Sequence, residues 1–137
     1  MRNKGFTLIE LLAVIVILAI IALIATPIIL GIINDARKSA KERSAELVYT
    51  GVEYAYTTAM YKGTSGTSIA DPTLETIKNN LSIDNMKTAT LNTEKAELTI
   101  ETNDGVTCNV TGNATNGFEV ECPGYMTTKS IAKVTSN

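Results

Sequence analysis

The stretch Phe6-Thr-Leu-Ile-Glu-Leu-Leu-Ala-Val-Ile-Val-Ile-Leu-Ala-Ile-Ile-Ala-Leu-Ile-Ala-Thr-Pro-Ile-Ile-Leu-Gly-Ile-Ile33 decides how this chain folds. Glu10 is its only charged residue, and from Leu11 to Ile33 the only polar side chain is Thr26. At about 1.5 Å per residue, this run is long enough to cross a hydrocarbon layer of roughly 30 Å. The sequence therefore predicts a membrane helix, with two features that a plain anchor does not need, Glu10 and Pro27.

A short basic head that ends in glycine, Met1-Arg-Asn-Lys-Gly5, precedes the apolar run. A secretory signal peptide has a similar start, but it is cut at a small-residue site beyond its apolar run. The small residues of the stretch from Ala22 to Ala25 lie inside the run, and no clear A-x-A site follows near the polar boundary. A signal-peptide interpretation is therefore weak.

The residues Lys4-Gly5-Phe6-Thr-Leu-Ile-Glu10 resemble the processing site of type IV pilins, and the apolar helix after them resembles that of the same family. The resemblance is to type IVa-like major pilins or to pseudopilins, and it points to a Gram-positive bacterial protein. It implies that a prepilin peptidase cuts the chain after Gly5 and methylates the new amino terminus at Phe6. Pro27 falls where many family members carry a helix-bending proline.

The resemblance also implies where the chain works and with what. The charges on the two sides of the apolar run do not decide its orientation, because Arg2 and Lys4 precede it and the basic stretch 37–43 follows it. The peptidase acts on the cytoplasmic face, which places the amino end of the precursor there. We expect a precursor in the inner (cytoplasmic) membrane and then a subunit of a cell-surface pilus. Its expected partners are copies of itself, an assembly platform and an ATPase.

Composition excludes several classes of function. A chain of 137 residues has room for one small domain beside the long helix, so a two-domain enzyme is excluded. Its formal net charge of -2 leaves no basic surplus for binding nucleic acid. The chain has no histidine, and its two cysteines lack the C-x-x-C spacing of zinc sites. We expect no catalytic residue, no metal and no cofactor.

The helical pattern continues beyond the apolar run without a turn signal until Gly63. The sequence thus predicts one helix from about Phe6 to about Tyr61, apolar all round in its first half and amphipathic in its second. Pro27 removes a backbone donor, and together with Gly31 it predicts a kink or flexible joint. The alternative is that membrane helices tolerate proline routinely.

The rest of the chain predicts an α+β fold, in which the long kinked N-terminal helix packs on a small antiparallel sheet of three to four strands. After a loop at 63–68, Asp71 is the expected N-cap of a short helix that reaches about Asn80, with Pro72 at its first position. Alternating residues predict strands at 96–102, 106–111 and 118–122, and more weakly at 129–134. The predicted divisions are a leader at 1–5, an assembly half of the helix at 6–33, an amphipathic half at 34–62 and a head domain at 63–137.

Cys108 and Cys122 lie on the inner faces of two strands that form a predicted hairpin. If this hairpin is symmetric about Thr115, the two cysteines are cross-strand neighbours with Cβ atoms roughly 4.5 to 5.5 Å apart. That separation is near what a disulfide needs. The alternative is a pair of free thiols in a small core.

Glu10 is the strongest candidate for a functional residue, because an acid within a membrane segment is costly and marks a functional site by default. Its natural partner is the ammonium of Phe6 that cleavage frees. The two residues could pair within one helix, whereas the resemblance implies pairing with a neighbouring subunit during assembly. The alternative is an interfacial glutamate that reaches lipid headgroups.

The sequence therefore predicts a structural subunit of a type IV pilus, which would serve adhesion, motility, aggregation or DNA uptake. A pseudopilin of a type II secretion or competence machine would use the same parts. An alternative of another class is a single-pass membrane anchor that carries a small binding domain. That alternative leaves the spacing of Gly5, Phe6 and Glu10 as a coincidence.

Overall fold

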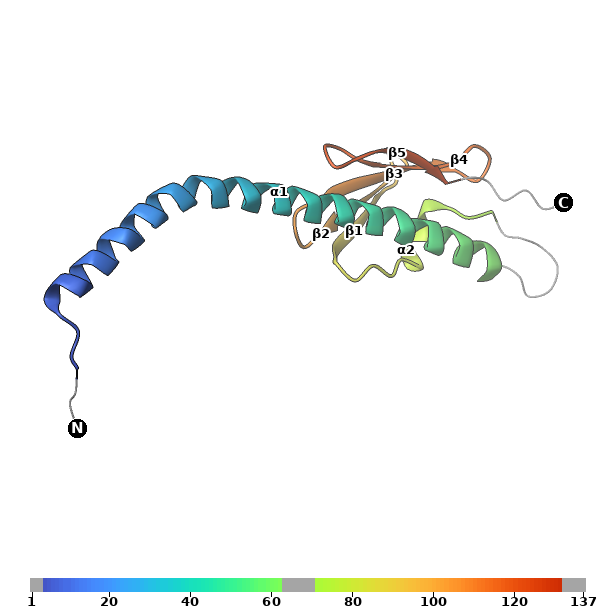
Figure 1. The fold of residues 1–137 in the computed structure, drawn as a ribbon. Coiled ribbons are helices and arrows are strands. Elements are labelled where there is room, and N and C mark those ends of the chain that lie inside the picture. The colour runs from blue at the N-terminus through green and yellow to red at the C-terminus, as the bar shows by residue number, and fades with distance from the viewer. Residues whose placement is uncertain (1–3, 63–70, 132–137) are drawn as a thin grey trace. The chain divides into compact units, whose positions relative to one another are not determined.

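The computed structural model describes residues 4–62 and 71–131. The chain divides into two units, Met1–Arg37 and Lys38–Asn137. The helix α1 (Leu8–Lys62) begins in the first unit and ends in the second (Figure 1). Its bounds agree with the predicted helix from about Phe6 to about Tyr61, and the predicted loop at 63–68 lies outside the described residues.

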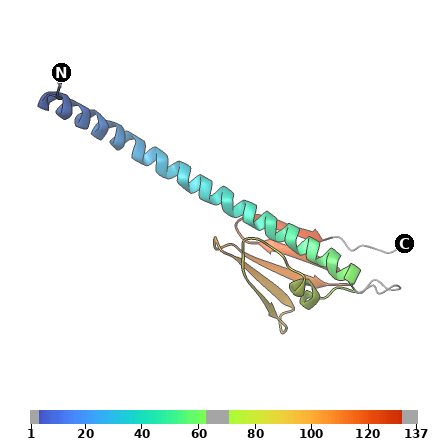
Figure 2. The same ribbon diagram turned by 90° about the horizontal axis from the view of Figure 1, so that it is seen from below.

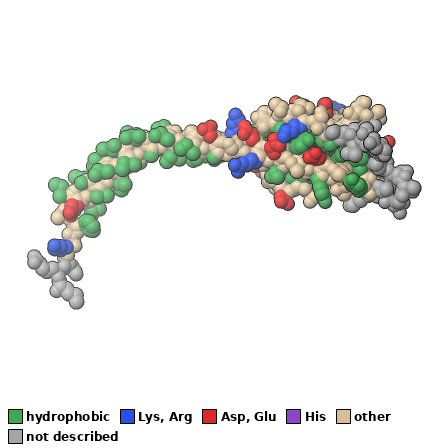
Figure 3. Space-filling model, turned by 45° about the vertical axis from the view of Figure 1, so that its right-hand side comes forward, with side chains coloured by type: hydrophobic (Ala, Val, Ile, Leu, Met, Phe, Trp, Pro, Cys, Tyr) green, Lys and Arg blue, Asp and Glu red, His purple; other side chains and the backbone are tan. Residues whose placement is uncertain are grey.

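The first unit consists of the amino-terminal part of α1 and the short segment before it. Its large apolar side chains are all exposed, from Leu8 at 86% to Ile33 at 40%, and they cover the face of the segment seen in Figure 3. Among the described residues, α1 is the one helix that is long and apolar enough to cross a membrane, and none of its most apolar window is buried. Such a surface needs a lipid or protein environment.

Polar groups inside this apolar segment are satisfied by the helix itself. The hydroxyl of Thr26 donates to the carbonyl oxygen of Ala22 at 2.6 Å. The α-helix continues unbroken through Pro27 and Gly31. The flexible joint expected at these two residues therefore remains a prediction.

The second unit contains a sheet of five antiparallel strands in the order β1-β2-β3-β4-β5. The strands are β1 (Met86–Asn92), β2 (Glu97–Thr102), β3 (Thr107–Asn113), β4 (Gly117–Cys122) and β5 (Met126–Ile131). Each strand pairs with the next along the chain, as Figure 2 shows. The predicted α+β class is confirmed, but the prediction of three to four strands is wrong.

The additional strand is β1, which sequence analysis missed. It reads Met-Lys-Thr-Ala-Thr-Leu-Asn, and none of its residues is fully buried. An edge strand that buries so little has a weak hydrophobic alternation, and pairing with β2 holds it in place. The strand predicted at 129–134 is β5. It begins earlier, at Met126, because this first residue pairs with Cys122 of β4. Residues 132–134 lie outside the described residues.

The core of the second unit lies between α1 and one face of the sheet. The helix contributes mainly small side chains. The fully buried members are Ala45, Val48, Val52 and Ala55 from α1, Leu98, Ile100, Cys108, Val110, Val120 and Cys122 from the strands, and Ile77 and Val106 from the segments between these elements. Tyr56 and Phe118 close one part of this core with their rings edge to face at a centroid distance of 5.7 Å.

The short helix α2 (Leu74–Asn79) starts later than predicted. Its N-cap is Thr73, not Asp71, because Thr73 and Thr76 form a reciprocal capping box. The amide of Thr76 donates to the Thr73 hydroxyl at 3.2 Å, and the Thr76 hydroxyl accepts from the Thr73 amide at 2.8 Å. Leu74 and Ile77 are buried, as expected for the inner side of this helix.

A partly buried polar network ties the turn between β2 and β3 to α1. The carboxylate of Asp104 accepts hydrogen bonds from Ser44 of α1 at 2.7 Å, from Asn85 at 3.1 Å and from Thr102. Burial of the carboxyl opposes its ionisation, but the hydrogen bonds from Thr102, Ser44 and Asn85 outweigh this and lower the pKa of Asp104. The charged carboxylate thus fixes the turn against the helix.

Cys108 and Cys122 form the disulfide that the hairpin register predicts, with Cα atoms 4.2 Å apart. The pairs Val110↔Val120 and Asn109↔Glu121 place the two cysteines opposite each other. Both are fully buried. The disulfide joins β3 to β4 beneath α1.

Cys108→Ser should lower the free energy of unfolding by about 3 kcal/mol, because the crosslink restricts a loop of about 15 residues in the unfolded chain. Chemical denaturation of the detergent-solubilised protein measures the loss. The double variant Cys108→Ala/Cys122→Ala is the control without a lone thiol. Two alkylatable thiols in the native wild-type protein would contradict the disulfide.

Gly51 lies in α1 where the chain before β1 crosses the helix. A Cβ atom here would overlap Cγ1 of Ile83 and lie 2.9 Å from its Cδ1. Gly51→Ala should destabilise the fold, because overpacking costs about 1 to 3 kcal/mol and exceeds the gain in helix propensity of about 1 kcal/mol. In an Ile83→Ala background the same change should be stabilising. Thermal unfolding of the four proteins tests this, and a higher Tm for Gly51→Ala alone would refute it.

Candidate functional site

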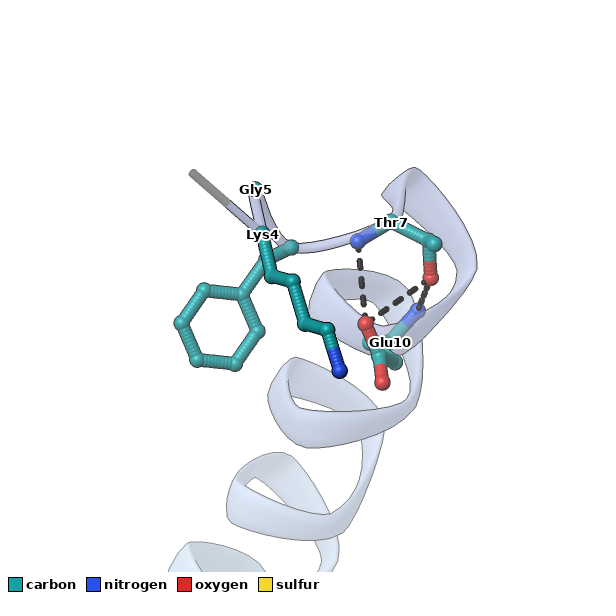
Figure 4. A pocket seen from close by; sticks show the side chains of 5 residues that line it. Lys4, Gly5, Thr7 and Glu10 are labelled. Carbon is teal, nitrogen blue, oxygen red and sulfur yellow. Dashed lines mark hydrogen bonds between the residues drawn. The ribbon is translucent and has the colours of Figure 1, made fainter. Parts of the chain in front are cut away.

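The candidate site lies at the start of α1, in the first unit. Lys4, Gly5, Phe6, Thr7 and Glu10 line an open hollow of about 490 Å³ (Figure 4). The structure therefore brings together three of the residues that the sequence singled out, the two at the expected cut and the acid. The other predicted residues lie elsewhere, with Pro27 and Gly31 further along α1 and the two cysteines in the second unit.

Thr7 and Glu10 form a reciprocal capping box at the amino end of α1. The Thr7 amide donates to Oε2 of Glu10 at 2.9 Å, and the Glu10 amide donates to the Thr7 hydroxyl at 3.3 Å. The Thr7 hydroxyl donates to the same Oε2 at 3.0 Å. Two backbone N–H groups that a helix start would leave without partners are thereby satisfied.

Sequence analysis missed Thr7, although a signal for it was present. Thr7-Leu-Ile-Glu10 matches the S/T-x-x-E pattern of a capping box ahead of an apolar run. Thr7 therefore joins the candidate site as the residue that positions Glu10.

The capping box leaves half of the Glu10 carboxylate available. Oε2 takes both hydrogen bonds from Thr7, and none of the described residues donates to Oε1. The side chain is exposed, and the amino end of a helix favours a negative charge. Glu10 is therefore an oriented carboxylate with room for one further cation or donor.

The bond between Gly5 and Phe6 lies outside the helix, in a segment where Lys4, Gly5 and Phe6 are all exposed. The Phe6 side chain is 84% exposed. A Cβ atom built on Gly5 would meet nothing within 4 Å. The fold of the chain therefore does not require glycine at this position, and a requirement for it would have to come from a protein that binds this segment.

The described residues contain no group of three or more His, Cys, Asp or Glu side chains that could hold a metal ion. The chemistry of the candidate site is thus that of a single carboxylate beside an accessible peptide bond. A site of this composition can form an ion pair or be cut by another protein.

Comparison with known protein families matches residues 1–26 to the prokaryotic N-terminal methylation motif. This motif is the class III signal of type IV pilins and pseudopilins. No curated protein and no solved structure matches the chain. The motif supports a structural precursor of the type IV pilin or pseudopilin type, and its apolar helix fits membrane anchoring.

Proposed function

We propose that this chain is the subunit of a type IV pilus, a filament that it builds with copies of itself. The observation that carries the proposal is that the N-terminal methylation motif heads a helical segment, as far as Ile33, whose large apolar side chains are all exposed. The chain is made as a membrane precursor, cut between Gly5 and Phe6, methylated at Phe6 and then polymerised. The apolar segment is the part that the filament core encloses.

The energetics of this assembly favour a specific polar contact. Lipid tails are as apolar as the side chains of α1, so moving the helix from lipid to a protein core brings little hydrophobic gain. Helices associate in such surroundings through close packing and polar pairs. Glu10 is the one charged side chain between Phe6 and Ile33 that can supply such a pair.

The cation that pairs with Glu10 is the amino terminus of Phe6 in a neighbouring subunit. Cleavage after Gly5 creates this ammonium at Phe6, four residues before Glu10 in the chain. Within its own chain the carboxylate is already held by Thr7 through Oε2, which leaves Oε1 for the second chain. Each added subunit would thus be set in register by one ion pair.

We infer the remaining partners from the motif and from the exposed segment around Gly5. A prepilin peptidase takes the exposed segment around Gly5, and an assembly platform with an ATPase lifts the subunit from the inner membrane to the cell surface. Adhesion, motility, aggregation or DNA uptake is the role of the resulting fibre. A pseudopilin would build a short fibre from the same parts, and electron microscopy with mass spectrometry of surface filaments separates the two.

Processing gives the first test of this proposal. The assembled protein should begin at methylated Phe6, and Gly5→Val should leave the full-length precursor in the membrane. Because a side chain at Gly5 meets nothing within 4 Å, this variant should fold like the wild type. Intact-mass measurement of sheared filaments checks the first result, and an assembled chain that retains Met1 would contradict it.

Variants of the capping box separate the charge of Glu10 from its cap. Glu10→Gln removes the charge but keeps a side chain that can form the box, Glu10→Ala removes both, and Thr7→Ala removes the threonine half and keeps the charge. An unpaired ammonium in an apolar core costs about 3 to 5 kcal/mol, whereas a lost cap costs about 1 kcal/mol. Both Glu10 variants should therefore be processed and stable but nearly absent from sheared filaments, and Thr7→Ala should assemble.

Immunoblots of sheared and cell-bound fractions, with each variant as the sole subunit, measure this series. Membrane insertion should not suffer, because removal of a charge makes the helix easier to place in lipid. Normal filament yield from Glu10→Gln together with failure of Thr7→Ala would show that Glu10 acts only as a cap. The ion-pair mechanism would then be wrong, while the filament could still exist.

A further inference from the structure

The turn between β3 and β4 contains the dipeptide Asn116-Gly117, the one place where this sequence has glycine directly after asparagine. Asn116 is exposed, and it lies just before the pair Asn113↔Gly117 that ends the pairing of the two strands. Glycine has no Cβ atom, so its backbone nitrogen is less shielded than that of any other residue. The dipeptide thus places a side-chain amide beside an open backbone nitrogen.

No described residue holds the side chain of Asn116. Its backbone amide donates to Oδ1 of Asn113 at 2.9 Å, but its side-chain amide forms no hydrogen bond with any residue that the structure describes. Asn113 lies in the same turn and differs in this respect, because its Oδ1 accepts from the backbone amides of Thr115 and Asn116. Two hydrogen bonds therefore orient the side chain of Asn113, whereas that of Asn116 is free to rotate.

The turn between β2 and β3 offers a comparison within the same protein. Here Asp104 precedes Gly105, and the backbone of both glycines is left-handed, with φ of +81° at Gly105 and +90° at Gly117. The carboxylate of Asp104 is fixed by its three hydrogen-bond donors. The two turns thus combine a similar glycine with a fixed side chain in one case and a free side chain in the other.

We propose that Asn116 is a site of spontaneous modification, at which its side-chain amide is lost and an aspartate or an isoaspartate results. The backbone nitrogen of Gly117 attacks Cγ of Asn116, and the new C–N bond closes a succinimide ring. The bond from Cγ to Nδ2 breaks, and Nδ2 leaves as ammonia together with the proton of the Gly117 nitrogen. Water then adds to one of the two ring carbonyl carbons. Addition at Cγ gives aspartate, and addition at the backbone carbon gives isoaspartate.

The reaction needs water and neither an oxidant nor a reductant. Either product adds one negative charge to an exposed turn, and isoaspartate also lengthens the backbone there by one atom. The disulfide between Cys108 and Cys122 keeps the two strands joined while the turn changes. Because ammonia is lost to the solvent, the modified form accumulates with the age of the chain. This inference does not rest on the proposed filament, since the turn belongs to the second unit.

Peptide mapping of the aged full-length protein tests the proposal. The detergent-solubilised chain is incubated at mildly alkaline pH in water labelled with heavy oxygen. One sample stays folded, and a second is unfolded in guanidinium chloride with its disulfide intact. Mass spectrometry follows amide loss at each asparagine, and electron-based fragmentation distinguishes aspartate from isoaspartate. Asn116→Gln is the matched control, because it keeps the amide and the exposed position but would have to close a larger ring.

We expect Asn116 of the folded protein to lose its amide about tenfold or more faster than Asn113, which must first break two hydrogen bonds and is followed by alanine. The products should be a mixture of aspartate and isoaspartate that carries solvent oxygen. Unfolding should change the rate at Asn116 by less than about tenfold, whereas isomerisation of Asp104 should accelerate about tenfold or more once its hydrogen bonds are lost.

Several outcomes would overturn the inference. If Asn116 reacts in the unfolded protein and stays intact in the folded one, the turn protects it. Equal rates at Asn116 and Asn113 in the folded protein would show that the free side chain has no effect. Aspartate as the sole product, or equally fast amide loss from Asn116→Gln, would indicate direct hydrolysis without a ring. Failure of the chain to appear in sheared filaments would count against the proposed function and leave this result unchanged.

Discussion

The structure depends on a single constraint, that α1 must satisfy its own backbone and polar side chains wherever its own chain does not cover it. Over its amino-terminal part the helix has no covering from its own chain. Its start is closed by Thr7 and Glu10, and the hydroxyls of Thr26 and Thr57 are bonded to carbonyl oxygens one turn back. Because these groups need no outside partner, the same helix is compatible with lipid, with a filament core and with a folded domain.

The second unit in turn depends on α1, because buried residues of this helix make up a large part of its core. One face of the strands is covered by buried residues of the helix, and the small residue Gly51 lets the chain at Ile83 pass close to it. Asp104 bonds to Ser44 of α1, and the disulfide of Cys108 holds the strands beneath. Loss of α1 packing would therefore disturb the whole second unit.

Sequence reasoning found the features that follow from strong local patterns. The apolar run predicts α1, and alternation around the turn after Gly112 predicts the register that places Cys108 opposite Cys122. It missed β1, whose inward residues such as Ala89 bury little area and whose place is set by pairing with β2. It also chose Asp71 as a cap where Thr73 takes that place through its bonds with Thr76. Tertiary pairing and competing caps decided these positions, and neither leaves a strong periodic signal.

The capping box changes how the acid at the start of α1 is to be understood. A cap explains why Glu10 is tolerated here, since Oε2 is satisfied by Thr7. It does not explain why the residue should be charged, because glutamine forms the same box. A role that requires glutamate must therefore use the charge, and a charge in apolar surroundings requires a cation nearby. Before cleavage Lys4 lines the same hollow as Glu10, and the cut expected after Gly5 would remove this lysine and free an ammonium at Phe6. In the proposed mechanism, processing thus replaces a cation of the leader by the one that pairs with a neighbouring subunit.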